Sequence, residues 1–124
     1  MANPGFSKNY TADAVMVTRR LAIYGAADGT VNMASLATQL LVGVVELGCT
    51  AIGDRVDIIK EGTALIEFGG AVTRGAALTA DAQGRAVVAA PGAGVNNHII
   101  GFAEISGVLG DIGEVWISRG IMQG

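Results

Sequence analysis

The stretch Val42-Gly43-Val44-Val45-Glu46 occurs a second time, in altered form, as Ile100-Gly101-Phe102-Ala103-Glu104. Working outward, Val17-Thr18-Arg19 is repeated as Val72-Thr73-Arg74, 55 residues further along the chain. Gly29 and Gly84 keep this offset, and the strands quoted first follow after a drift of three residues. Both halves then continue with a glycine and an acid: Ile52-Gly53-Asp54 and Ile112-Gly113-Glu114. This duplication predicts two pseudo-repeated halves, about residues 15–70 and 71–120, that close together and protect their strand edges.

Between these landmarks, Gly and Asp interrupt short apolar stretches about every ten residues, which indicates strands rather than helices. Hairpin-type turns are predicted at Asp28-Gly29 and Gln83-Gly84, and similar turns at Glu61-Gly62 and Gly69-Gly70. We therefore expect an all-β fold, a small β-barrel or sandwich with at most short helical turns. The predicted strands are Val15 to Tyr24, Gln39 to Leu47, Arg55 to Lys60, Thr63 to Phe68, Ala76 to Thr79, Arg85 to Ala89, Ile99 to Ile105 and Glu114 to Ser118.

Residues 1–11 are polar and aperiodic apart from Phe6 and Tyr10, and we predict an extended N-terminal arm there. Residues 12–124 are predicted to form a single β domain, because a chain of 124 residues can bury one proper core. Trp116 lies between Val115 and Ile117 in the last predicted strand, so its ring points to the opposite side from theirs. We expect this side to be a subunit interface.

The composition points to a surface covered by partners. Hydrophobic residues make up 51% of the chain and charged ones 15%, while aromatic residues are scarce. The net charge of -3 and scattered basic residues argue against nucleic acid as a partner. A single cysteine, no signal-peptide pattern and no apolar run long enough for a membrane span predict a soluble protein made in a reducing cytoplasm, with no membrane partner.

No arrangement of residues indicates catalysis, a cofactor or a metal. His98 is the single histidine and lies in a polar stretch, and Cys49 follows a glycine without a neighbouring cation, so neither is predicted to react. The acids Asp54 with Glu114, and Glu46 with Glu104, occupy matching places in the two halves. A repeated turn or strand end explains them better than an acid and base pair, which needs two different environments. The chain is therefore predicted not to be an enzyme.

The combination of Val-Thr-Arg, the Gly hairpins, Ile99-Ile100-Gly101-Phe102-Ala103-Glu104 and the ending Gly110-Asp111-Ile112-Gly113-Glu114-Val115-Trp116-Ile117 resembles the capsid decoration, or cement, proteins of tailed bacteriophages. The resemblance covers about Val15 to Arg119 and implies a virion protein on the outer capsid surface. It would bind the major capsid protein and stabilise contacts between its subunits. It implies a homo-oligomer too, for which we expect a trimer, with a dimer as the alternative.

In this setting the terminal arm and the exposed tryptophan are the predicted contacts with the capsid or with other subunits: Asn3, Pro4, Phe6, Tyr10 and Trp116. Three alternatives remain open. A small-ligand-binding β-barrel would need a cavity. An enzyme acting on sugars or peptides would use Asp54, Glu114 or His98. A biotin- or lipoyl-type domain would display Lys60, but the sequence around this lysine lacks the usual context.

Overall fold

The computed structural model describes residues 4–124, and this part of the chain forms nine β-strands and no helix. The predicted all-β class is confirmed. All nine strands belong to one sheet, with the order β1-β3-β2-β4-β5-β9-β8-β6-β7. The strands are β1 (Pro4–Ala12), β2 (Leu21–Tyr24), β3 (Thr30–Met33), β4 (Leu41–Leu47), β5 (Arg55–Glu67), β6 (Ala77–Ala80), β7 (Ala86–Val88), β8 (Asn96–Ala103) and β9 (Ile112–Gln123).

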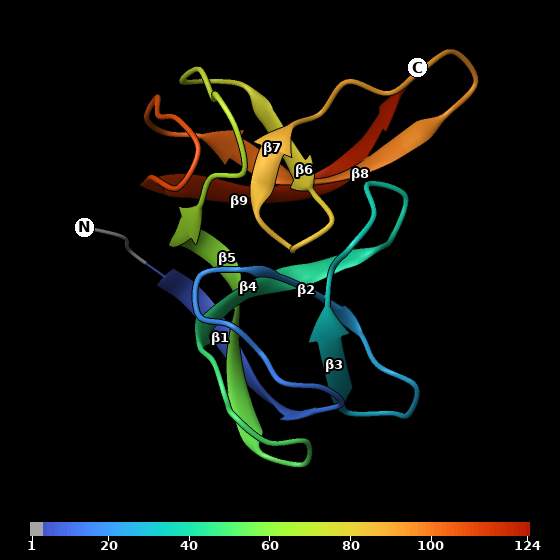
Figure 1. Ribbon diagram of the computed structural model, residues 1–124, viewed down its shortest axis with the longest axis vertical. Coiled ribbons are helices and arrows are strands. Elements are labelled where there is room, and N and C mark those ends of the chain that lie inside the picture. The colour runs from blue at the N-terminus through green and yellow to red at the C-terminus, as the bar shows by residue number, and fades with distance from the viewer. Residues whose placement is uncertain (1–3) are drawn as a thin grey trace.

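The first half of the chain closes into a ring of five strands, drawn from blue to green in Figure 1. β1 pairs in parallel with β3, and β2 pairs with both β3 and β4. β4 then pairs with β5, and β5 returns to β1 in an antiparallel ladder that runs from Thr11 opposite Arg55 to Pro4 opposite Gly62. The closed ring leaves these strands without a long free edge.

The second half repeats this plan with the end of β5 in the place of β1. Thr63 to Glu67 of β5 pair with β9, which continues through β8 and β6 to β7. Phe68, directly after β5, makes a parallel bridge to Ala86 of β7, as the end of β1 does to β3. The long strand β5 is thus shared by the two halves, and Figure 1 shows it passing from one to the other.

Several backbone hydrogen bonds of the first half have an equivalent in the second. The amide of Ala12 donates to the carbonyl of Asp54, and the amide of Phe68 donates to that of Asp111, both at 2.8 Å. Gly53-Asp54 is therefore equivalent to Gly110-Asp111, and the sequence alignment of Asp54 with Glu114 was wrong by three residues. The error arises because the second half has two glycine–acid pairs, Gly110-Asp111 and Gly113-Glu114, and the sequence pattern does not distinguish them.

A second correction concerns Arg19, whose amide donates to Val45 as that of Gly75 donates to Ala103. Arg19 is therefore equivalent to Gly75, one position away from the predicted match with Arg74. Both residues have a positive φ, 64° for Arg19 and 90° for Gly75. The turn requires a left-handed backbone in both halves, and this requirement, rather than the repeated Val-Thr-Arg letters, sets the equivalence.

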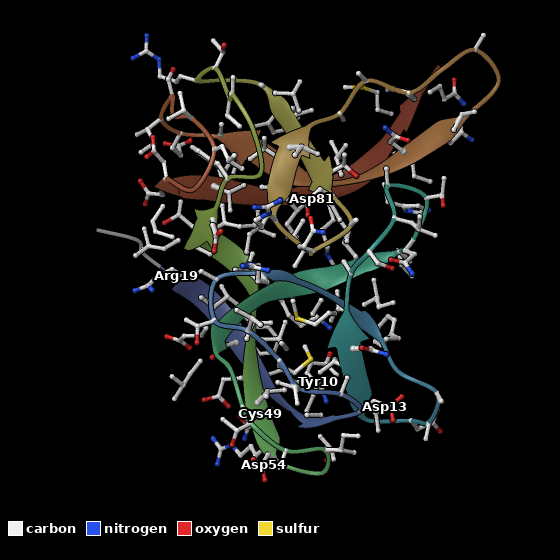
Figure 2. The ribbon with its side chains drawn as sticks, in the orientation of Figure 1. Tyr10, Asp13, Arg19, Cys49, Asp54 and Asp81 are labelled. Atoms are coloured by element: carbon white, nitrogen blue, oxygen red, sulfur yellow. The ribbon has the colours of Figure 1, made fainter. Side chains whose placement is uncertain are left out.

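Residues 4–11 differ from the expected arm, because they form most of β1 and are paired along β5. Tyr10 and Ala12 point inward from this strand, and Figure 2 shows Tyr10 inside the first half. The predicted turn at Glu61-Gly62 lies within β5 instead. Gly62 has a φ of 88° opposite an irregular part of β1, so its backbone freedom serves a bulge.

One core runs through both halves. Its members include Leu21 and Val44 from the first half and Phe68, Leu78 and Ile100 from the second. A smaller cluster around Tyr10 fills the interior of the first ring. Because the main cluster crosses from one half to the other, neither half can lose its partner without exposing apolar surface.

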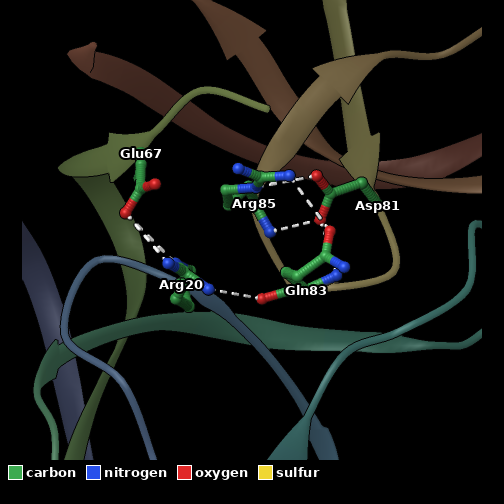
Figure 3. Close-up of polar contacts among 5 residues, drawn as sticks. All are labelled: Arg20, Glu67, Asp81, Gln83 and Arg85. Carbon is green, nitrogen blue, oxygen red and sulfur yellow. Dashed lines mark hydrogen bonds and ion pairs between the residues drawn. The ribbon is translucent and has the colours of Figure 1, made fainter. Parts of the chain in front are cut away.

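A polar clamp fastens the same boundary (Figure 3). Arg20 precedes β2, and its guanidinium donates to the Glu67 carboxylate at 3.1 and 3.3 Å and to the Gln83 carbonyl at 2.8 Å. The side chains of Arg20 and Glu67 are 18% and 23% exposed. Next to them, the amide of Leu21 donates to the carbonyl of Gly84 at 2.7 Å. The first half is therefore bonded directly to the β6–β7 turn of the second.

The change Arg20→Ala is expected to lower the free energy of unfolding by about 2 kcal/mol, because it leaves a half-buried carboxylate and a carbonyl without their donor. Urea unfolding followed by tryptophan fluorescence measures this loss. Arg55→Ala is the matched control, since the Arg55–Asp57 pair is exposed and should contribute less than about 0.5 kcal/mol. Equal losses in the two variants would contradict the clamp.

Candidate interaction surface

The residues considered for chemistry lie apart from one another. Asp54 lies in the loop before β5, whereas Glu114 lies on β9 opposite Leu65. The Cys49 thiol is partly buried, with the carbonyl oxygen of Ala51 at 3.5 Å. Within residues 4–124, no three His, Cys, Asp or Glu side chains come close enough to hold a metal ion. No helix of this part of the chain has the length and apolar character to cross a membrane.

Large apolar side chains, in contrast, are often exposed on this protein. Single exposed apolar residues are ordinary, but neighbouring ones mark surfaces that partners cover. Those exposed over more than a third of their area are Phe6, Val15, Val17, Tyr24, Leu36, Leu40, Leu47, Ile52, Leu65, Val88, Val95, Ile105, Val108, Leu109, Ile112, Trp116 and Ile121. The pairing of the strands shows which of these exposed side chains lie next to one another.

One such place is the outer face of β8, β9 and β5. Trp116 is 51% exposed, whereas Val115 and Ile117 are buried, as the alternation along the strand predicts. Trp116 lies opposite Phe102, and the two ring centroids are 6.1 Å apart with a tilt of 39°. This aromatic pair presents a wide apolar area with few rotatable bonds, which suits a protein interface.

The contact residues predicted near the N-terminus differ in their exposure. Phe6 is half-exposed on β1, but Tyr10 is 6% exposed and belongs to the core, so its assignment to the contact surface was wrong. Tyr10 lies on the inward face of β1, where the Lys60 ammonium donates to its hydroxyl at 2.8 Å. The backbone of Pro4 pairs opposite Gly62, and Asn3 lies outside the described residues.

A second apolar surface was not predicted from the sequence. Leu47 and Ile52, at the end of β4 and in the following loop, are 69% and 71% exposed. The hydrogen-bond match makes Ile105 and Leu109 their equivalents, and these are exposed as well. The duplicated fold therefore presents the same kind of apolar loop end twice.

A shallow groove of about 360 Å³ lies between the start of β4 and the far ends of β8 and β9. One wall is the start of β4, where the Arg119 guanidinium donates to the carbonyl of Leu41 at 3.3 Å. The lining is mostly apolar and contains two basic side chains and no acidic one: Leu40, Leu41, His98, Ile99, Arg119, Gly120 and Ile121. Nothing in the sequence pattern had pointed to this groove.

No protein-family model and no curated protein matches this chain. Among solved structures, it is similar to the crystal structure of the head fiber gp8.5 N base in bacteriophage phi29. The two chains superpose with a TM-score of 0.71 at 19% sequence identity, over 96% of this chain and 98% of the other. At this identity the similarity concerns the fold, and it extends over nearly the whole of both compared chains.

Proposed function

We propose that this protein is a structural component of a bacteriophage head that binds the outer surface of the assembled capsid. There it stabilises contacts between major capsid subunits. The observation that carries the proposal is the full-length structural similarity to the phi29 head fiber N base, a piece of a phage head. It agrees with the resemblance of the sequence to decoration proteins, which was drawn from different features.

The exposed apolar surfaces support the proposal physically. Large apolar side chains are exposed at Trp116, next to Phe102, and at the loop ends around Leu47 and Ile105. A protein that binds the assembled shell but not its free subunits stabilises the shell by mass action. Several linked contacts strengthen this binding further, which favours a homo-oligomer. We propose a trimer, with a dimer as the alternative, assembled in the host cytoplasm and carried on the virion.

Co-sedimentation with capsids assembled without this protein tests the proposal, with free major capsid subunits alongside. We expect saturable binding to shells and none to free subunits. Trp116→Ala should weaken this binding, whereas Tyr24→Ala changes an equally exposed aromatic residue on β2 and should leave it unchanged. Absence of binding by the folded protein would contradict the proposal and redirect attention to small ligands.

A further inference from the structure

The C-terminal part of β9 has a free edge. Val115 and Trp116 of β9 pair with both β5 and β8, but from Ile117 onward β9 pairs only with β8. Figure 1 shows the far ends of β8 and β9 reaching past the rest of the second half as a two-stranded ribbon. A free edge with apolar side chains attracts another strand unless charge, proline or a covering loop protects it.

The register shows which backbone groups face this edge. The amide of His98 donates to Ala37 at 2.8 Å, and its carbonyl accepts from the Thr79 hydroxyl at 2.7 Å, so both groups point away from β9. His98 lies opposite Ile121. In an antiparallel pair, the backbone amides and carbonyls of two opposite residues either bond each other or both point away from the partner strand. The amide and carbonyl of Ile121 therefore point to the free edge, and two residues on, those of Gln123 do the same.

The side chains beside this edge specify a chemistry. Ile121 is 57% exposed and lines the groove together with Leu40 and Arg119. Although the chain as a whole carries a charge of -3, the groove contains the Arg119 guanidinium and no carboxylate. An added strand that carried an aspartate or glutamate next to an apolar residue would match both features of the groove.

We propose that the free edge of β9 receives an extended, acidic segment of a capsid subunit. The segment adds to the sheet through the backbone of Ile121 and Gln123 and places a carboxylate on Arg119. This inference rests on the proposed function and identifies one of its binding surfaces. The segment would lie alongside Ile121, with apolar side chains on Leu40.

Hydrogen exchange measured on the protein alone and bound to shells tests the added strand. The amides of Ile121 and Gln123 should exchange at least about tenfold more slowly in the bound protein, since they gain acceptors. The turn amides of Asp28 and Gly29 serve as an internal control. Binding to shells without added protection at Ile121 and Gln123 would overturn the inference and leave the proposed function standing. Absence of binding would overturn the proposed function itself.

Two variants separate the backbone from the charge. Ile121→Pro removes an outward amide and leaves the bonds to β8 in place, so it should weaken shell binding at least about tenfold without unfolding the protein. Arg119→Glu should weaken binding similarly, whereas Arg119→Lys keeps the charge and should lose less. Circular dichroism checks the fold of each variant. Unchanged binding by folded Arg119→Glu would overturn the acidic partner, and concentration-dependent protection of Ile121 without shells would assign the edge to a second copy.

Discussion

Replacing Phe68 with alanine is expected to lower the free energy of unfolding by about 4 kcal/mol. Phe68 is fully buried and belongs to the core cluster that joins the two halves. Its ring lies directly over two glycines, Gly107 and Gly113, where an added Cβ would collide with it. Removing the ring therefore leaves a cavity that the rigid strands around it cannot close. Urea unfolding measures the loss, which is a large share of the stability of a domain of this size.

The repeat explains why this site holds a phenylalanine. The hydrogen-bond match makes Ala12 the equivalent of Phe68 and places Cys49 and Val56 where the second half has Gly107 and Gly113. The first half thus combines a small residue on the first strand with two larger residues opposite it. The second half combines a large residue, Phe68, with two glycines. Total volume is kept while its distribution changes, which is the kind of core change that proteins tolerate best.

This exchange allows a sharper test with a double variant. Gly113→Val alone should destabilise the protein strongly, because the new side chain meets the Phe68 ring. In the Phe68→Ala background the same valine enters the vacated space, as Val56 does beside Ala12. The double variant should therefore lose about 1–3 kcal/mol less free energy of unfolding than the two single variants lose together. Strict additivity would show that the two positions do not share one packing site.

The class of fold was predictable because its signals are local. Short apolar stretches interrupted by glycine turns identify strands such as Leu41–Leu47 without knowledge of their partners. Gly62 shows where local signals stop, since a glycine with positive φ serves equally in a hairpin turn and in a bulge. Only the ladder between β1 and β5 decides between them. For the same reason residues 4–11 read as an arm, although their pairing with β5 makes them a strand.

The candidate surface was predictable in part. Trp116 could be placed outward from its neighbours alone, because alternation is a property of the strand itself. Tyr10 could not be placed, since its burial depends on the ring that β1 closes and on Lys60, 50 residues away, whose ammonium donates to the Tyr10 hydroxyl. The groove beside Ile121 joins residues near positions 40, 98 and 120, and its free edge follows from register. No single segment of the sequence therefore predicts the groove or the free edge.

Gly101→Ala is expected to cost about 3 kcal/mol, the second large effect. Gly101 lies on β8, and a Cβ there would collide with the backbone carbonyl of Trp116 on β9. A backbone group of a paired strand cannot move aside as a side chain can. Gly43, the equivalent glycine of the first half, would meet the backbone carbonyl of Ile59 in the same way. The repeated glycine therefore lets two strands approach closely at the same point of each ring.

Gly120→Ala provides the control on the neighbouring strand. A Cβ on Gly120 would have its nearest contact at 3.8 Å, with the Ile99 side chain. Because alanine restricts the unfolded chain more than glycine, this variant should keep its stability or gain up to about 1 kcal/mol. Thermal unfolding of both variants measures the contrast. Since the collision in Gly101→Ala falls on the backbone of Trp116, that variant should also shift the tryptophan fluorescence of the folded protein. A stable Gly101→Ala protein with unchanged fluorescence would contradict the close approach of β8 and β9.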